Sequence, residues 1–397
     1  MIGQSVCRYV RDIFTSNKDM SRINHSYLVL IPKVQMPEYL HQFRPIGLCN
    51  VILKALSKVI VGRLQALMPN LISEVQSSFV PGRQITDNII VAQEVIHSMR
   101  KMKGKKGFMT IKVDLEKAYD ILSWKFIRET LIDARLPSDL IRVIMQSIET
   151  QTLSVLWNGS ATQKFSPNRG IRQGDPLSPY IFVLCLEKLS QLINRQVEDN
   201  SWKPFRMRRN GLKISHLCFA DDMLLFTEAS MDQLERVTKC LDTFCAASGQ
   251  KVSNTKTKVY FSKNVSVSLA GDISRRSGFQ ITKDMGKYLG VPLLHQKVTK
   301  NTYSYLLDNM QKKLAGWKAS NLSLAGKITL CKSVLSTIPL YPMQAAVIPK
   351  HTCYEIEKIC RRFIWGQQEG RDKIHLVNWN KMCRPKEEGG MGLKKMK

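Results

Sequence analysis

Hydrophobic residues recur at helical spacing in several long stretches of this chain. Leucine and isoleucine repeat at this spacing over residues 53–64, and a second amphipathic stretch covers residues 85–99. We expect Pro69 to end the first of these helices, because proline cannot donate the next backbone hydrogen bond. An apolar run over residues 180–193 predicts another helix, and from Tyr303 onward the pattern is mainly helical.

Other stretches have the shorter period of β-strands. Residues 108–113 put apolar side chains at every second position, which predicts a half-buried strand. Residues 27–31 predict a short apolar strand, and residues 153–157 followed by Asn158-Gly159 predict a hairpin. Strands and helices alternate irregularly, which favours an α+β fold over a doubly wound sheet.

Residues 217–226 place two adjacent carboxylates, Asp221 and Asp222, between two apolar runs. The pattern predicts a β-hairpin, but Asp-Asp is a poor turn pair, because adjacent like charges repel and resist burial. A divalent cation would remove that repulsion, whereas a solvated turn is the plain alternative. Asp114 follows the predicted strand 108–113, a usual position for a metal ligand on a rigid element.

The composition points to a polyanionic partner. The chain has 397 residues with 60 basic and 32 acidic side chains, a formal net charge of +28. Nucleic acid is the commonest partner of so basic a protein, and no apolar run reaches the length of a membrane-spanning helix. The ten cysteines form no Cys-x-x-Cys pair and no regular spacing, so we expect reduced intracellular thiols.

Three aspartates in this pattern suit two-metal phosphoryl transfer. Mg²⁺ needs only one or two carboxylates beside substrate phosphates and water. Lys33 and Arg44 can neutralise a triphosphate, although a solvated surface charge is the ordinary interpretation of either residue alone. The glycine-rich loop 169–179 precedes the helix 180–193 and suits close approach of backbone to a phosphate or a base pair.

Several short motifs follow one another in a fixed order along the chain. In that order they are Ile31-Pro32-Lys33, Arg44-Pro45-Ile46, Pro81-Gly82-Arg83-Gln84, Asp114-Leu115-Glu116-Lys117-Ala118-Tyr119-Asp120, Gln173-Gly174-Asp175-Pro176-Leu177-Ser178-Pro179, Phe219-Ala220-Asp221-Asp222, Tyr288-Leu289-Gly290-Val291, Cys383-Arg384-Pro385-Lys386 and Gly389-Gly390-Met391-Gly392. The series resembles a reverse transcriptase, in the variants found in plant non-LTR (LINE-type) retrotransposon proteins. The combination is specific, although each motif alone is not.

The resemblance implies an RNA-directed DNA polymerase that uses two Mg²⁺ ions, with Mn²⁺ as an alternative, to transfer nucleotides onto a primer 3′-OH. It makes Asp114, Asp221 and Asp222 the metal-binding catalytic residues and Tyr119 the aromatic gate against a ribose 2′-OH. The other site residues that it implies are Lys33 and Arg44 on the incoming triphosphate, Gln173 and Gly174 under the nascent base pair, and Lys256 near the leaving pyrophosphate as a candidate general acid.

The resemblance also implies a right-hand polymerase. We expect fingers over residues 1–107, a palm over 108–295 with an inserted fingers segment and an antiparallel sheet carrying the Asp-Asp hairpin, and a helical thumb with C-terminal connection over 296–397. The expected partners are an RNA template, a DNA primer and dNTPs, without a membrane, in the nucleus and cytoplasm. Proteins of this kind also carry an endonuclease and often a zinc-binding or RNase H region, so we expect the chain to be a fragment.

Three other functions stay open on the sequence. A catalytically inactive retrotransposon remnant would bind RNA or RNA–DNA duplex through the same basic surfaces. A maturase-like protein would use the fold as an RNA-binding splicing factor. An RNA-dependent RNA polymerase would share the metal site, but the bulk of Tyr119 should reject ribonucleotides.

Overall fold

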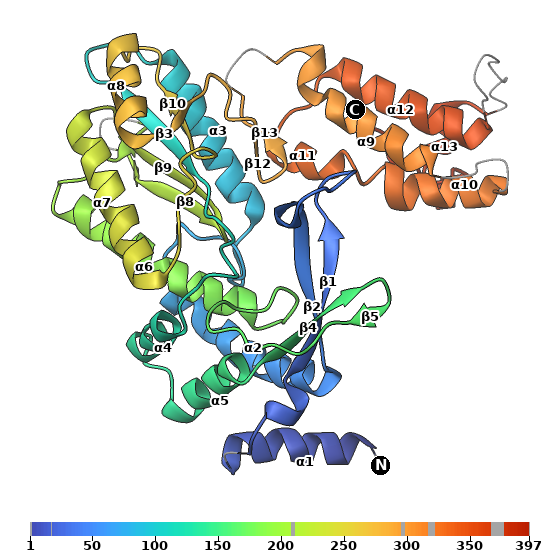
Figure 1. Cartoon of the computed structure of the whole chain (residues 1–397). Coiled ribbons are helices and arrows are strands. Elements are labelled where there is room, and N and C mark those ends of the chain that lie inside the picture. The colour runs from blue at the N-terminus through green and yellow to red at the C-terminus, as the bar shows by residue number, and fades with distance from the viewer. Residues whose placement is uncertain are drawn as a thin grey trace. The chain divides into compact units, whose positions relative to one another are not determined.

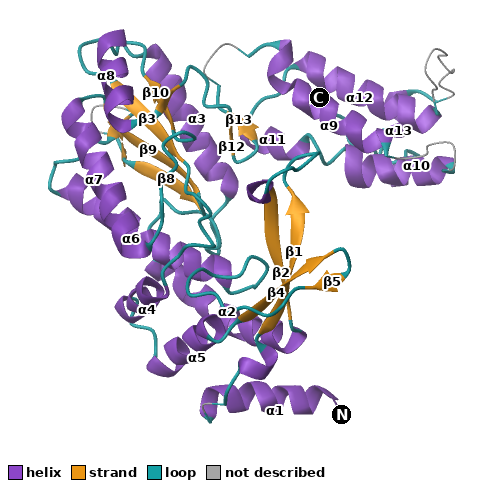
Figure 2. Cartoon of the chain, viewed as in Figure 1, coloured by secondary structure: helices purple, strands orange, loops and turns teal. Residues whose placement is uncertain are grey.

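The computed structural model describes residues 2–16, 18–207, 211–294, 298–316, 322–366 and 377–396. The chain divides into two compact units, the first formed by residues 1–88 and 98–285 and the second by residues 89–97 and 286–397. Figure 1 traces the chain through both units, and Figure 2 shows its helices and strands. The strands of the two larger sheets all belong to the first unit. The predicted fingers, palm and thumb boundaries stay predictions, and the boundary at 295–296 lies outside the described residues.

The first sheet of unit 1 joins two distant parts of the sequence. Its four strands run in the order β2-β1-β4-β5. The strands are β1 (His25–Pro32), β2 (Phe43–Cys49), β4 (Thr152–Trp157) and β5 (Ser160–Ala161). β1 pairs antiparallel with β2 and parallel with β4, while β4 and β5 form the hairpin predicted at Asn158-Gly159.

The second sheet carries the Asp-Asp hairpin, as predicted. Its order is β11-β10-β3-β9-β8, and all its pairs are antiparallel except β10 with β11. The strands are β3 (Phe108–Val113), β8 (His216–Phe219), β9 (Asp222–Glu228), β10 (Lys258–Phe261) and β11 (Gln280–Ile281). Because Val113 pairs with Met223 and Phe219 with Asp222, the end of β3 and the tip of the β8–β9 hairpin meet at one edge of the sheet.

The helices in this part of the chain are α1 (Ile2–Thr15), α2 (Val51–Leu71), α3 (Ile85–Lys101), α4 (Trp124–Asp133), α5 (Ser138–Glu149), α6 (Ser178–Glu198), α7 (Met231–Ser248) and α8 (Val267–Ser277). Residues 89–97 of α3 belong to unit 2, and the rest of these helices belong to unit 1. The Ser123 hydroxyl accepts a hydrogen bond from Phe126 N and so caps the start of α4. The short pair β6 (Phe205–Arg206) and β7 (Lys213–Ile214) completes the strands of this unit.

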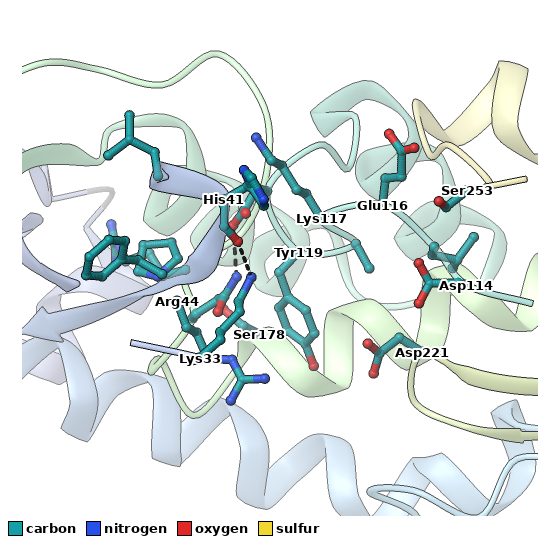
Figure 3. Close-up of a pocket in the computed structure, with 18 of the residues that line it drawn as sticks. Lys33, His41, Arg44, Asp114, Glu116, Lys117, Tyr119, Ser178, Asp221 and Ser253 are labelled. Atoms are coloured by element: carbon teal, nitrogen blue, oxygen red, sulfur yellow. Dashed lines mark hydrogen bonds between the residues drawn. The ribbon is translucent and has the colours of Figure 1, made fainter. Parts of the chain in front are cut away.

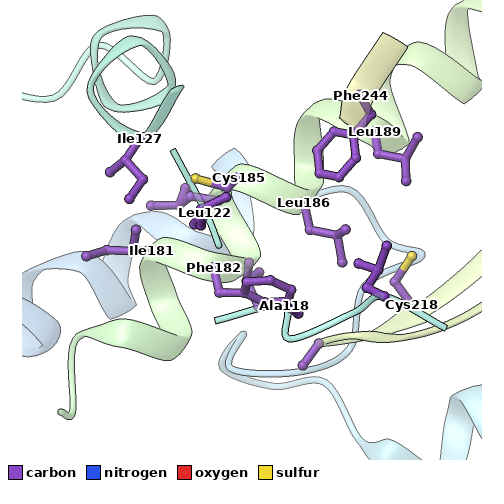
Figure 4. Close-up of a cluster of buried hydrophobic side chains, with 14 of the residues drawn as sticks. Ala118, Leu122, Ile127, Ile181, Phe182, Cys185, Leu186, Leu189, Cys218 and Phe244 are labelled. Carbon is purple, nitrogen blue, oxygen red and sulfur yellow. The ribbon is translucent and has the colours of Figure 1, made fainter. Parts of the chain in front are cut away.

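The hydrophobic core of unit 1 gathers around α6. Figure 4 shows side chains of this helix, Phe182 and Leu186 among them, packed with Ala118 from the segment after β3 and Cys218 from β8. These four side chains are each less than 10% exposed. Burying one large apolar side chain contributes roughly 1.5–3 kcal/mol, so the core fixes the segment after β3 against α6.

The prediction that Pro69 ends its helix is wrong. α2 continues to Leu71 with Pro69 inside it. The proline removes one backbone hydrogen bond in the last turn, but Met68 and Ile72 on either side are buried in the core. The Ile72 amide also donates to the Met68 carbonyl, so the turn closes beyond the proline.

Unit 2 is mainly helical from Tyr303 onward, as predicted. Besides residues 89–97 of α3, it contains the short hairpin of β12 (Lys287–Tyr288) and β13 (Val291–Pro292). The helices that follow are α9 (Ser304–Ala315), α10 (Leu324–Leu330) with a π-turn over Cys331–Leu335, α11 (Leu340–Ala345), α12 (Lys350–Trp365) and α13 (Trp379–Met382). Among the described residues, no helix combines the length and the apolar character that crossing a bilayer demands.

Candidate active site

A cavity of about 940 Å³ opens in unit 1 and contains most of the predicted site residues. This volume lies within the usual range for small-ligand sites. The predicted site residues that line this cavity, called the edge cavity below, are Lys33, Arg44, Asp114, Tyr119, Gln173, Gly174, Asp221 and Lys256. The structure therefore brings together side chains that are up to about 220 positions apart in the sequence.

Asp114 and Asp221 are the paired carboxylates of the edge cavity. Figure 3 shows their carboxylates near one another and directed to the same side, toward Tyr119; Asp114 follows β3 and Asp221 lies in the hairpin turn. Burial raises the pKa of the Asp114 carboxyl, the Lys256 ammonium opposes this shift, and the negative charge of Asp221 adds to it. This pair can hold a divalent cation, which would offset both the burial and the repulsion.

The segment that follows α2 holds the hairpin turn in place through hydrogen bonds to its backbone. Ala220 has φ 50°, an uncommon conformation for a residue with a side chain. Its amide donates to Gln76 Oε1 at 3.0 Å and to Ser78 Oγ at 2.8 Å. The Asn88 Nδ2 donates to the Cys218 carbonyl at 2.8 Å. No spacing or motif in the sequence indicates these contacts, since residues 76–78 lie more than 140 positions before Ala220.

Asp222 occupies a different position from Asp221. It is the first residue of β9 and is not among the described residues that line the edge cavity. Burial raises the pKa of its carboxyl, and the nearby Lys112 ammonium opposes that shift. Since side chains alternate along a strand, Asp222 shares a sheet face with Leu224, the partner of Lys112. Sequence reasoning did not single out Lys112.

Tyr119 lies in the edge cavity and stacks on the core. Its ring is parallel to that of Phe182, with centroids 4.8 Å apart and an interplanar angle of 16°. Burial, followed by the negative charge of Asp221, raises the pKa of the Tyr119 hydroxyl to about 12. The hydroxyl therefore stays protonated at neutral pH, and the ring is held in place at the wall of the cavity (Figure 3).

The cationic side of the edge cavity comes from the β1–β2 hairpin. Arg44 lies in β2 opposite Ile31, so its backbone is extended as Pro45 predicts. Lys33 follows β1 directly, and its Nζ donates to the His41 carbonyl at 3.0 Å (Figure 3). Lys256 belongs to the turn before β10 and lies within electrostatic reach of Asp114.

Buried hydrogen bonds and an ion pair of Arg172 and Asp175 hold the glycine-rich loop in place. Arg172 is buried, donates to the Ser147 carbonyl at 3.2 Å and lies 3.6 Å from the Asp175 carboxylate. Asp175 Oδ1 in turn accepts from Leu177 N at 3.0 Å, just before α6 begins at Ser178. A buried and paired arginine of this kind fixes the loop, so Gln173 and Gly174 have a rigid support.

The donor set of the edge cavity fits a hard cation. Asp114 and Asp221 supply two carboxylates, and Mg²⁺ is ordinarily held by one or two carboxylates together with substrate phosphates and water. Within the described ranges, no cluster of three or more His, Cys, Asp or Glu side chains is arranged to hold a metal ion. These two carboxylates are residues of the cavity that can hold such a cation, with substrate oxygens as the further ligands.

The chain is similar in sequence to a known protein family and to several known proteins. A family model described as "Reverse transcriptase (RNA-dependent DNA polymerase)" matches residues 31–293, which include every predicted site residue. The Xenopus laevis "Transposon TX1 uncharacterized 149 kDa protein" is 23% identical over 396 residues, covering 99% of this chain and 29% of that protein. A Popillia japonica "Retrovirus-related Pol polyprotein from type-1 retrotransposable element R2" is 26% identical over 330 residues, covering 78% of this chain and 50% of that protein.

The chain spans half or less of the length of these two relatives. Among solved structures, a telomerase from Candida Tropicalis in complex with a fragment of telomeric RNA matches with a TM-score of 0.48 and 15% identity. That match covers 86% of this chain and 53% of the telomerase chain. We base the family assignment on the sequence match over residues 31–293.

Proposed function

The chain belongs to the reverse transcriptase family, and on that premise we propose that it is the RNA-directed DNA polymerase of a non-LTR retrotransposon. The observation that carries the proposal is the convergence of Asp114 and Asp221 in one cavity whose opposite side carries Lys33 and Arg44. Paired carboxylates facing two cations suit a reaction at a triphosphate held by divalent metal ions.

Asp114 and Asp221 would hold two Mg²⁺ ions, or Mn²⁺ in their place. When bound, the ions would lower the pKa of the primer 3′-OH and stabilise charge on the departing pyrophosphate. Asp222, paired electrostatically with Lys112, would support the hairpin beside these ligands.

Lys33 and Arg44 bind and orient the incoming dNTP in this proposal. Their charges lie across the edge cavity from the carboxylates, so they would contact the β- and γ-phosphates and leave the α-phosphorus beside Asp114 and Asp221. Lys256 would donate a proton to the leaving pyrophosphate, since it lies near Asp114 on the same side of the cavity.

The other proposed roles concern selection. Tyr119 would exclude a ribose 2′-OH by its bulk, because its ring is fixed on Phe182. Gln173 and Gly174 would lie under the nascent base pair formed with an RNA template. The net charge of +28 favours binding of the template–primer duplex through its phosphates.

Extension of a DNA primer on an RNA template tests this function. We expect the wild-type chain to extend the primer with Mg²⁺ and to stop when EDTA is added. Asp221→Asn should lower the rate by about 10³-fold, because the amide cannot balance the metal charge. Template binding should survive this change, since the phosphates contact basic side chains elsewhere.

The matched control is Asp139→Asn, which removes one carboxylate from an exposed side chain of α5. Wild-type binding without extension would refute the polymerase and favour the RNA-binding remnant. Undiminished incorporation by Asp221→Asn would refute the assignment of the metal site.

A further inference from the structure

We propose that Asp120 is a positioning residue, which holds the Gln173 amide in one orientation and thereby sets the affinity for the incoming nucleotide. Gln173 Nε2 donates to Asp120 Oδ1 at 3.0 Å, and both residues line the edge cavity. The proposal rests on the polymerase function above, in which Gln173 contacts the nascent base pair.

Backbone hydrogen bonds set the distance between these two side chains. Gly170 N donates to the Leu122 carbonyl at 2.7 Å, and the next amide in the chain donates to the Tyr119 carbonyl at 2.8 Å. Gly170 has φ 82°, and a Cβ there would lie 2.4 Å from the Asp120 carbonyl oxygen. Only glycine permits this approach, so the segment that carries Asp120 is locked against the loop that carries Gln173.

The backbone of Gln173 is held from the other side by β2. Gly47 N donates to the Gln173 carbonyl at 2.6 Å. Gly174 has φ 113°, and a Cβ there would lie 2.7 Å from the Gly47 carbonyl oxygen. Gln173 is therefore fixed at its backbone by β2 and at the end of its side chain by Asp120.

The chemistry of the pair leaves one amide orientation. A carboxylate only accepts hydrogen bonds, so Nε2 must face Asp120 and Oε1 must face away from it. A nucleotide that reaches Gln173 would meet one acceptor, Oε1, and one remaining N–H. This fixed pattern suits a hydroxyl or amino donor of the nucleotide, because the amide needs no reorganisation on binding.

If Asp120 acted only through its charge, removing its carboxylate would lower the KM for the dNTP, whereas loss of the Gln173 orientation would raise it. The Asp120 carboxylate lies within reach of the Lys117 and Lys33 charges, which attract phosphates. Removing the negative charge would strengthen that attraction and lower the KM for a dNTP. Losing the amide orientation would raise the KM, so the sign of the change separates the two explanations.

Single-nucleotide incorporation on an RNA template tests the proposal. We expect Asp120→Ala to raise the KM for the dNTP by about 10-fold, the scale of one charge-assisted hydrogen bond, and to change kcat much less. Asp120→Asn keeps the shape but offers either end of its amide to Gln173, so its KM should rise by a smaller factor. Asp139→Asn, at an exposed carboxylate of α5, is the control for loss of one charge.

A double-mutant cycle with Gln173→Ala shows whether Asp120 acts through Gln173. If it does, adding Asp120→Ala to Gln173→Ala changes the KM no further. A KM that is unchanged or lower in Asp120→Ala would overturn the proposal, and so would an equal rise in the Gln173→Ala background, which marks a merely structural role. Absence of extension by the wild-type chain would instead overturn the polymerase function, and this proposal with it.

Discussion

At the scale of single residues, the edge cavity places two carboxylates where mutual repulsion and, for Asp114, burial disfavour the charged form. The same cavity contains aromatic and cationic side chains that can position a ligand. Asp114 is half-buried beside Asp221, and burial raises the pKa of its carboxyl. The repulsion between them is a cost in the free protein that a bound cation would remove. Tyr119 borders the same space and is fixed by its contact with Phe182.

Tyr119→Ala should admit ribonucleotides. The substitution removes the ring from the cavity wall, and we expect the relative incorporation efficiency of ribonucleotides to rise by about 10-fold or more. The ratio of kcat/KM for matched rNTP and dNTP substrates measures the effect. Tyr119→Phe keeps the ring and should keep the preference. If Tyr119→Ala retains the wild-type ratio, the gate lies elsewhere.

His216 should make stability depend on pH. The residue is fully buried in β8, and burial lowers the pKa of its imidazole to about 4. Below pH 6.5 the unfolded chain takes up a proton that the folded protein excludes, so the free energy of unfolding falls as the pH drops from 6.5 toward 4. The loss should reach about 3 kcal/mol.

Urea denaturation across this pH range measures the effect. The control is His216→Gln, which removes the titrating group and should flatten the decline. An equal decline in wild type and His216→Gln would show that His216 does not cause it.

At the scale of elements, the Asp-Asp hairpin depends on a segment that precedes it by more than a hundred residues. Residues 76–78 bond to Ala220, and Cys218 exchanges backbone hydrogen bonds with the same segment. The Arg83 guanidinium holds this segment by donating to the carbonyls of Ile72, Ser73 and Gln76. The hairpin turn is thus supported through Arg83 by the end of α2.

Arg83→Ala should destabilise unit 1. Three backbone carbonyls would lose charge-assisted hydrogen bonds, and we expect the free energy of unfolding to fall by about 2–4 kcal/mol. Arg83→Lys should recover only part of this, because an ammonium cannot reproduce the planar fork of a guanidinium. The urea midpoint reports the change, and a midpoint equal to wild type in Arg83→Ala would contradict the brace.

The elements that the sequence predicted well are those with local signals. The period of residues 108–113 and the apolar runs around Asp221 predict β3 and the β8–β9 hairpin, because side-chain alternation is a property of each strand alone. The local signal of Pro69 predicts a helix end that the structure does not have, since the burial of Met68 and Ile72 outweighs the one hydrogen bond that the proline removes.

The contacts that sequence reasoning missed are long-range. Gln76 meets Ala220 across 144 positions, and Asp120 meets Gln173 across 53. Neither pair has a spacing or composition that marks it, because hydrogen bonds between distant backbone segments bring the partners together: Cys218 bonds to the segment that carries Gln76, and Gly170 bonds to the segment after β3. Asp120 is the last residue of the motif at residues 114–120, but nothing in that motif indicates its partner.

At the scale of the whole molecule, the net charge and the family match both point to a nucleic-acid partner. The net charge of +28 favours a polyanionic partner, and the reverse transcriptase match covers residues 31–293. Because binding through phosphates weakens steeply with salt, activity comparisons between variants need one fixed ionic strength.

In this account Asp114, which follows β3, and Asp221, in the β8–β9 turn, act as a single metal-dependent unit. The most direct test of this claim is the rate of DNA primer extension on an RNA template with Mg²⁺, for wild type, Asp114→Asn, Asp221→Asn and the double variant. We predict that each single variant loses about 10³-fold and that the double variant is no slower, as for residues that act together. An Asp114→Asn variant that extends the primer at the wild-type rate would contradict the claim.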